Sequence, residues 1–276
     1  MRPILAALAC APLLTGIPTA RAQTRPQPTL VLSVFGGLNG GAALWRQEGQ
    51  PFLVQTLAGP DPGKYDTLDL TRKIVPGFVL GVTATYHPGP HLGYQAEVSF
   101  LGLTLESQCA IRRYQPADPA DLNPQLCASL QGQTTTLSAV NVSAGVVARM
   151  SPRGAVSPYV RLGGGLVART RGTIQMVGSY LSSPTTVNRA LILDDANPRT
   201  VGAALTAAAG MAVPLGQGYQ LHLEARDTYT RLDRVGGLAD PSSGTLTPPR
   251  GDRFVHVLIF AVGLDIVLEQ KRGRRY

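Results

Sequence analysis

Four histidines are the side chains best suited to act as a general base, and their surroundings bear on whether the chain could be an enzyme. His87 and His91 flank a tight turn, whereas His222 and His256 fall in strand-like segments. A lipid-modifying hydrolase needs a nucleophile and a base within hydrogen-bond reach. No serine stands two residues from His256, as a His-x-Ser pair would require. We therefore predict no catalytic residues and a protein that is not an enzyme; a lipid-modifying enzyme is a less favoured alternative.

Ionic side chains alternate with apolar ones in several segments, and this alternation predicts strands with two unlike faces. In the segment 218–232, Leu221 and Leu223 alternate with Glu224 and Arg226, a period of two that is typical of a β-strand. Because isolated ions buried in an apolar core are costly, this pattern excludes an ordinary β-sandwich. In a membrane barrel, the apolar face meets lipid and the polar face meets the lumen. The predicted lumen charge network consists of Glu97, Arg161, Arg169, Glu224 and Arg226, with His222 and Asp265 as further candidates.

The elements that must position these residues are eight predicted strands. They cover residues 28–38, 77–87, 91–105, 133–150, 155–171, 199–213, 218–232 and 253–268. Short connections, rich in proline and glycine, occur at 87–90, 151–154 and 214–217. The other four connections, at about 39–76, 106–132, 172–198 and 233–252, are long.

Long and short connections alternate along the chain, and this sorting predicts the orientation of a barrel. Odd and even connections of an up-and-down barrel lie at opposite ends, and transmembrane barrels have short periplasmic turns and long external loops. The predicted fold is all-β: an eight-stranded antiparallel up-and-down transmembrane β-barrel with short periplasmic turns and long extracellular loops. An interior of this size is just wide enough for side chains to fill, so the charge network is interpreted as a rigid plug.

Aromatic residues on the apolar face gather near both ends of the predicted strands. This distribution is typical of the two interfacial girdles of a membrane barrel, although strands favour aromatic residues in general. The predicted girdle residues are Tyr86, Tyr94 and Tyr219 beside the short turns, and Phe78, Phe100, Tyr229 and Phe254 toward the long loops.

Two cysteines, Cys109 and Cys127, lie in one long connection, and an even pair in an exported chain predicts a disulfide. A metal or redox pair is the alternative, but the spacing matches no metal motif. Carboxylates in the long connections could bind a divalent cation, yet their spacing fits no calcium loop, so we interpret them as solvated. No metal site and no cofactor are predicted. These carboxylates are Asp61, Asp66, Asp69, Asp194 and Asp195.

Residues 1–22 have the three zones of a secretory signal peptide. Arg2 is followed by an apolar stretch, and Ala20 and Ala22 are the small residues that a signal peptidase reads, which predicts cleavage after Ala22. Acylation of Cys10 as a lipoprotein is an alternative, although the residues before it fit a lipobox poorly. We therefore divide the chain into a signal peptide (1–22), an outer-membrane β-barrel (23–268) and a basic C-terminal tail (269–276).

The formal net charge of +8 could indicate a nucleic-acid partner, but export separates the chain from nucleic acid. The predicted location is the cell outer membrane of a Gram-negative bacterium. The predicted partners are outer-membrane lipids, the outer-membrane assembly machinery and an unknown extracellular ligand. The protein is expected to be a monomer.

With a signal peptide, eight strands and four long loops, the chain resembles the small outer-membrane β-barrels of the OmpA and OmpX type. The stretches Gly93-Tyr94-Gln95-Ala96-Glu97 and Pro158-Tyr159-Val160-Arg161-Leu162-Gly163-Gly164-Gly165-Leu166 are similar to strands of that family. The resemblance covers nearly all of the chain after residue 22. It departs at the end of the last strand, where Leu268 occupies a position that is often aromatic, and in the absence of a following periplasmic domain.

The resemblance implies a fold and a location more than an activity. The predicted function is that of a non-enzymatic barrel with a structural or surface-recognition role. The alternatives are a porin-like channel for ions or small solutes, a lipid-modifying enzyme, and a soluble lipocalin-like barrel in the periplasm.

Overall fold

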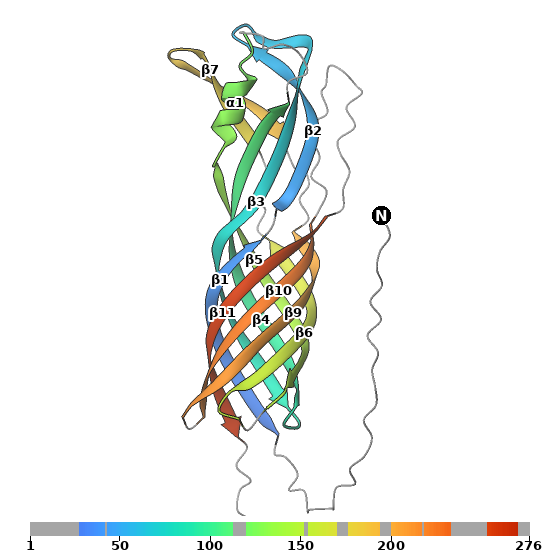
Figure 1. Ribbon diagram of the computed structural model, residues 1–276, viewed down its shortest axis with the longest axis vertical. Helices are drawn as coiled ribbons and strands as arrows, with labels where there is room; N and C mark the ends of the chain where they lie inside the picture. The colour runs from blue at the N-terminus through green and yellow to red at the C-terminus, as the bar shows by residue number, and fades with distance from the viewer. Residues whose placement is uncertain are drawn as a thin grey trace, which may run out of the picture.

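Eight strands close into a ring in the computed structural model, which describes residues 28–41, 43–112, 120–151, 154–169, 176–193, 200–216, 218–232 and 253–269 (Figure 1). The predicted signal peptide and residues 270–276 of the basic tail lie outside the described residues. In the order around the ring, the strands are β1 (Thr29–Gly41), β11 (Arg253–Glu269), β10 (Tyr219–Leu232), β9 (Val201–Gly216), β6 (Ser157–Arg169), β5 (Thr134–Arg149), β4 (Leu92–Arg112) and β3 (Gly59–His87).

The ring closes because β1 pairs on both of its edges. Its pairing with β11 runs without a break from Thr29 opposite Glu269 to Gly41 opposite Val257. Its pairing with β3 runs from Thr29 opposite His87 to Asn39 opposite Gly77. All pairings in the ring are antiparallel, which confirms the predicted fold class. Closure leaves no strand edge in the ring, and it satisfies the backbone groups inside the sheet where lipid offers no partner.

The faces of the ring alternate as the period of two requires. On β4, Tyr94, Val98 and Phe100 are exposed on the outside, whereas Glu97 and Ser99 are buried inside. The outside of the other strands is likewise apolar, with Leu162, Leu205 and Phe260 among its most exposed side chains. A surface of this kind would be costly in water and is suited to hydrocarbon.

Three of the four long connections carry secondary structure of their own, in a unit that we call the head. β3 and β4 extend beyond the ring, with 29 and 21 residues respectively. β2 (Ala43–Thr56) pairs with the extended part of β3. The helix α1 (Asn123–Leu130) and the hairpin of β7 (Met176–Ser183) and β8 (Thr186–Leu193) complete the head (Figure 1). The fourth connection, 233–252, lies outside the described residues.

The head has an apolar core. On the extended part of β3, Leu68 and Leu70 are completely buried, as are Leu126 and Leu130 on α1 and Ile192 on β8. Burying a side chain of this size contributes about 1.5–3 kcal/mol relative to leaving it exposed. The cluster that these residues form continues into the mouth of the barrel, so the head and the barrel share one apolar interior.

No helix in the described part of the chain has the length and apolarity needed to cross a membrane.

Candidate functional site

The centre of the barrel lumen holds a cluster of two arginines and two glutamates, each at most 7% exposed. Arg161, from β6, donates to Glu97 Oε2 at 2.5 Å and to Glu224 Oε1 at 3.0 Å. Arg226, from β10, donates to Glu224 Oε1 at 2.7 Å through Nη2 and also to Glu97. Each cation therefore contacts both anions, and the four charges cancel. We call these four residues the lumen cluster.

Neutral side chains fill the remaining bonding positions of the carboxylates. Ser99 Oγ donates to Glu97 Oε1 at 3.0 Å, and the Tyr159 hydroxyl donates to Glu224 Oε2 at 3.0 Å. Gln95 accepts from Arg161 Nη1 at 3.0 Å. Buried ions are tolerated when they are paired and their other bonding positions are filled. The lumen cluster meets the first condition, and it meets the second except at Arg161 Nε, which is buried without a hydrogen-bond partner.

Glycines on the neighbouring strands make room for two large rings beside the lumen cluster. The Phe35 ring lies over Gly81, where a Cβ would come within 2.4 Å of it, and the His222 ring lies over Gly263, where the distance would be 2.2 Å. The guanidinium of Arg226 lies 4.9 Å from the centre of the Phe35 ring, a cation–π geometry. The two glycines therefore allow ring positions that any other residue would obstruct.

The lumen differs on the two sides of the lumen cluster. Toward the short turns it contains a polar cavity of about 40 Å³, which has room for a few water molecules. Thr85, His87, Arg149 and Asp265 are among its lining residues. Toward the head, apolar side chains fill the lumen; they include Val79, Leu101, Val167, Val257 and Ile259. Asn39, Asn141 and Thr228 are buried beside these apolar residues, so the lumen is mixed toward the head and more polar toward the turns.

Of the other lumen candidates, two lie at the cavity and one lies apart. His222 Nδ1 and Asp265 Oδ1 are 2.5 Å apart, and both side chains are buried at the cavity wall. Arg169 is half-buried at the outer end of β6, eight residues beyond Arg161. At about 3.3 Å per residue, that separation is roughly 26 Å along the strand, so Arg169 is not a member of the lumen cluster.

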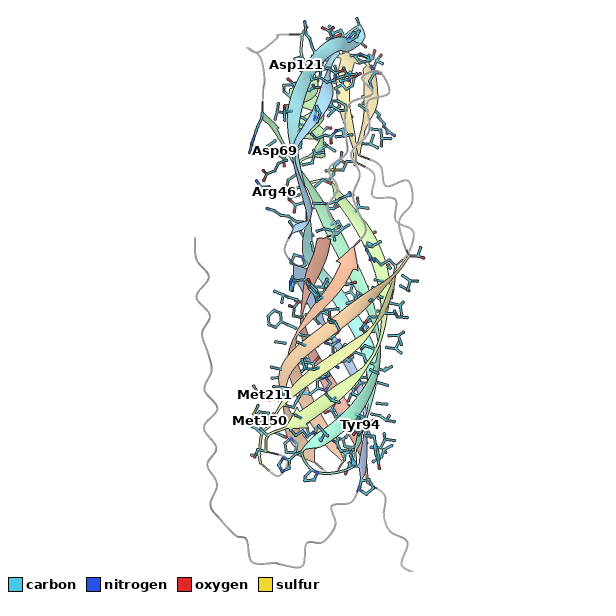
Figure 2. All side chains as sticks on the ribbon, turned by 90° about the vertical axis from the view of Figure 1, so that its right-hand side faces the viewer. Arg46, Asp69, Tyr94, Asp121, Met150 and Met211 are labelled. Carbon is cyan, nitrogen blue, oxygen red and sulfur yellow. A yellow bond between two sulfur atoms is a disulfide. The ribbon has the colours of Figure 1, made fainter. Side chains whose placement is uncertain are left out.

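The predicted girdle residues lie at the two ends of the barrel exterior. Tyr86, Tyr94 and Tyr219 are about half exposed beside the short turns, and Tyr94 is visible there in Figure 2. At the opposite end, the Phe78 and Phe100 rings lie with their centres 5.7 Å apart. Tyr229 is half-buried, and the side chain of Phe254 lies outside the described set.

His256 faces the exterior at the outer end of β11, where it forms a pair with Asp227 of β10. His256 Nδ1 lies 2.8 Å from Asp227 Oδ2, and the Tyr229 ring centre is 4.8 Å from that of the histidine. Asp227 is the one acidic residue on the otherwise apolar face of β10, and His256 is its polar partner. No serine, cysteine or threonine among the described residues is hydrogen-bonded to His256, so the pair has the base and the acid of a hydrolase but no bound nucleophile.

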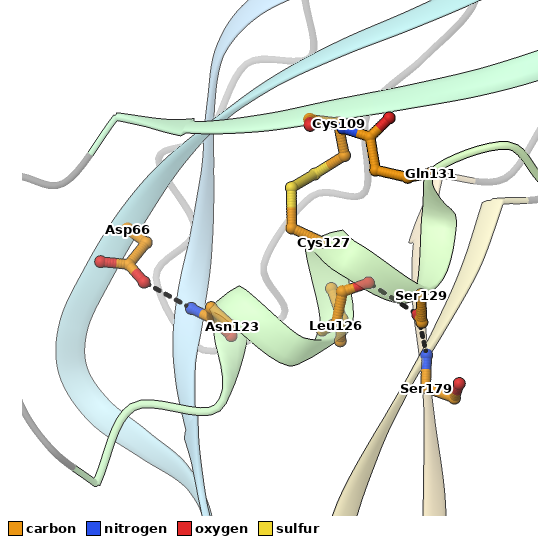
Figure 3. Close-up of a disulfide and its surroundings, with 8 residues drawn as sticks. All are labelled: Asp66, Cys109, Asn123, Leu126, Cys127, Ser129, Gln131 and Ser179. Carbon is orange, nitrogen blue, oxygen red and sulfur yellow. Dashed lines mark hydrogen bonds between the residues drawn. A yellow bond between two sulfur atoms is a disulfide. The ribbon is translucent and has the colours of Figure 1, made fainter.

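In the head, a disulfide between Cys109 and Cys127 joins β4 to α1 (Figure 3). Asn123, at the start of the same helix, donates to Asp66 Oδ2 of β3 at 2.8 Å and accepts from the Gln55 backbone of β2 at 3.3 Å. These contacts tie α1 to all three long strands of the head. Of the predicted loop acids, Asp66 is therefore a structural residue.

The remaining loop acids have other surroundings. Asp69 forms a 2.7 Å ion pair with Arg112, and Asp61 forms one of 3.1 Å with Lys64. Asp194 and Asp195 lie outside the described residues. Within the described ranges, no group of three His, Cys, Asp or Glu side chains is placed to hold a metal ion.

Arg72 is a buried cation that the alternation pattern did not single out. It is 2% exposed on the inner face of β3 in the head, and its Nη2 donates to Thr135 Oγ1 at 2.8 Å. Burial lowers the pKa of its guanidinium from the ordinary value. Its position between Leu70 and Ile74, on the inward side of a strand, is the only sequence signal that could have indicated its burial.

A closed ring with an apolar exterior, and with ions confined to its interior, defines a class of protein. The chain is a transmembrane β-barrel of the bacterial outer membrane, the membrane in which closed barrels of this size are found.

Known proteins are similar to this chain in structure only, at low sequence identity. Neither a protein-family model nor a curated protein matches the sequence. Similar solved structures include the outer membrane protein OprG from Pseudomonas aeruginosa, at 10% identity over 89% of this chain and 99% of that one, with a TM-score of 0.46. Neisserial surface protein A matches at 10% identity over 86% and 96%, with a TM-score of 0.39. The outer membrane protease OmpT from Escherichia coli matches at 10% over 89% and 98%, with a TM-score of 0.35.

Proposed function

We propose that the protein is a non-enzymatic outer-membrane barrel that serves as a rigid base for a folded recognition head at the cell surface. The observation that carries this proposal is the filled lumen: four mutually paired charges occupy its centre, and apolar side chains fill it toward the head. A barrel filled in this way is suited to support rather than to transport.

The head supports the recognition role. Its core residues, its disulfide and the Asn123 contacts hold a defined surface above the barrel. Flexible loops would lose conformational entropy on binding a partner, whereas a preformed surface has lost much of it on folding. A disulfide-linked head is therefore suited to binding an extracellular partner.

The non-enzymatic part of the proposal rests on the surroundings of the histidines. His222 is buried against Asp265 in a cavity that admits only a few water molecules. His256 is accessible from outside the barrel, but among the described residues its polar partner is Asp227. Neither histidine is hydrogen-bonded to a hydroxyl or thiol among the described residues. Within that part of the chain, neither has the paired nucleophile that a covalent hydrolase needs.

The polar cavity at the turn end favours a second candidate function, a narrow path for ions or small solutes. Such a path would have to pass the lumen cluster and the apolar side chains beyond it.

Conductance in a planar bilayer separates the two functions. We expect no ion conductance from the full-length protein. Discrete conductance steps from the unaltered protein would overturn the scaffold proposal in favour of the channel.

A further inference from the structure

The β7–β8 hairpin is part of the head (Figure 1), and among the described residues only its β7 edge has hydrogen-bond partners outside the hairpin. On the β7 edge, the Ser179 backbone N–H donates to Ser129 Oγ at 2.8 Å and the Leu181 N–H donates to Gln125 Oε1 at 3.3 Å. The first of these bonds is visible in Figure 3. Side chains of α1 thus accept hydrogen bonds from the backbone N–H groups along this edge.

The register of the hairpin determines which backbone groups face the opposite edge. Ser179 pairs with Arg189, Leu181 with Val187, and Val177 with Leu191. In an antiparallel pair, two residues that stand opposite each other direct their backbone N–H and C=O groups either both toward the partner strand or both away from it. The N–H and C=O groups of Val187, Arg189 and Leu191 therefore face outward along β8. Among the described residues, none forms a hydrogen bond with these groups.

The side chains of the same three residues lie on the outward face of the hairpin. Val187 is 59% exposed and Leu191 is 37% exposed, and Leu181 opposite Val187 is 50% exposed. Their neighbours on the other face, Ile192 and Tyr180, are buried in the head core. Apolar residues on both faces of a strand are typical of a strand that is covered on both sides. The exposed Arg189 lies between the two apolar side chains, and it forms no ion pair with any acid in the described part of the chain.

We propose that β8 binds an extended segment of a partner protein, which adds to the hairpin as a third strand. This inference rests on the proposed recognition function and specifies its partner. Main-chain hydrogen bonds to an exposed edge supply affinity in this mode of binding, and alternate side chains supply specificity. The side chains opposite Val187, Arg189 and Leu191 should be apolar, acidic and apolar in turn, because opposite charges across a strand pair stabilise it and like charges destabilise it.

The charge on β8 argues against a second copy of this chain as the partner. A symmetric antiparallel pairing of two β8 strands would place Arg189 opposite Arg189 when it is centred on that residue, and opposite Leu191 when it is centred on Ala190. The first register creates an unfavourable like-charge pair and neither supplies an acid, whereas a carboxylate in a foreign segment would neutralise the arginine. The third strand is therefore assigned to an acidic segment of another protein.

A synthetic peptide tests this assignment on the full-length protein in lipid nanodiscs. The probe is the heptapeptide Thr-Val-Thr-Glu-Thr-Val-Thr, and its control carries lysine in place of glutamate. Amide hydrogen exchange should slow at Val187, Arg189 and Leu191 when the first peptide is present in millimolar excess, with no change at Ser179 and Leu181. Fluorescence anisotropy should show binding of the lysine peptide that is about two- to fivefold weaker.

Two variants of the protein separate edge pairing from other contacts. Val187→Pro removes an outward N–H without removing a bond within the hairpin, as an edge strand tolerates, and it should abolish binding, whereas Val187→Thr should retain it. Continued protection of the Tyr180 and Asn188 amides shows that the hairpin is intact. Arg189→Glu should reverse the preference between the two peptides.

Protection of the three β8 amides, together with the reversed preference, supports the inference. Three results would overturn it: no protection with either peptide, equal binding by the proline and threonine variants, or self-association of the protein that Val187→Pro removes. None of these results affects bilayer conductance, so failure of this inference is distinct from failure of the scaffold proposal.

Discussion

The lumen cluster balances two arginines against two glutamates, so loss of one carboxylate leaves a buried positive charge uncompensated. We predict that Glu97→Gln lowers the free energy of unfolding by about 3–5 kcal/mol, the cost typical of breaking a buried pair. The change is measured by urea unfolding in detergent micelles. The folded fraction is read from an unboiled gel, on which a closed barrel migrates faster than the same chain after boiling.

Glu106→Gln is the matched control for this prediction. Glu106 lies on the extended part of β4, opposite Lys73 and outside the lumen. The same chemical change should alter stability there by no more than about 0.5 kcal/mol. If Glu97→Gln proves as stable as its control, the lumen cluster does not stabilise the barrel.

At the residue scale, the sequence could predict that the charged side chains of the lumen cluster face inward, but it could not predict how far along the barrel axis each one lies. Arg161 and Arg169 lie on the same face of β6 because they are an even number of residues apart. Only Arg161 reaches Glu97 and Glu224, since depth depends on how far each strand is shifted against the next. That shift is a property of the closed ring. The contact between Phe35 and Arg226 was hidden for the same reason.

At the element scale, the disulfide joins α1 to β4 across a separation of 18 residues. We predict that the double variant Cys109→Ser and Cys127→Ser destabilises the head by about 3 kcal/mol, the chain-entropy value for a loop of this size. The barrel should remain closed because Cys109 pairs with Leu70 in the extended parts of β3 and β4, beyond the ring, and Cys127 lies on α1. Limited proteolysis with mass spectrometry should show new cleavage between residues 107 and 131 while the heat-modifiable shift of the barrel persists.

Ala128→Ser provides the control for this prediction, because Ala128 is an exposed residue of the same helix. It introduces a hydroxyl without removing the disulfide, so its cleavage pattern should match that of the unaltered protein. Loss of the barrel shift in the double serine variant would mean that the head and the barrel unfold as one unit.

The elements of the ring could be predicted almost completely from the alternation of side chains, whereas those of the head could not. Leu68, Leu70 and Ile74 do alternate with polar residues, but the nearby Pro60, Pro62 and Gly63 are typical of loops. The hairpin of β7 and β8 has apolar residues on both faces, which removes the period of two. β7 is defined by packing against α1, and β8 by pairing with β7, rather than by a local pattern.

At the scale of the whole molecule, the alternation of long and short connections places all described parts of the head at one end and the turns at the other. Figure 2 shows this separation, with Arg46, Asp69 and Asp121 in the head and Met150 and Met211 near the turn end. Short periplasmic turns and large external segments are the rule in transmembrane barrels. The head should therefore face the exterior of the cell.

Labelling of single cysteines in intact cells tests this orientation. Leu57 is 66% exposed in the head and Leu215 is 60% exposed near a short turn, so Leu57→Cys and Leu215→Cys form a matched pair. A membrane-impermeant maleimide should label Leu57→Cys in intact cells but should label Leu215→Cys only after the outer membrane is permeabilised. The native Cys109 and Cys127 should stay unlabelled because they are joined to each other. Labelling of Leu215→Cys, rather than Leu57→Cys, in intact cells would reverse the orientation and place the head in the periplasm, where it could not meet an extracellular partner.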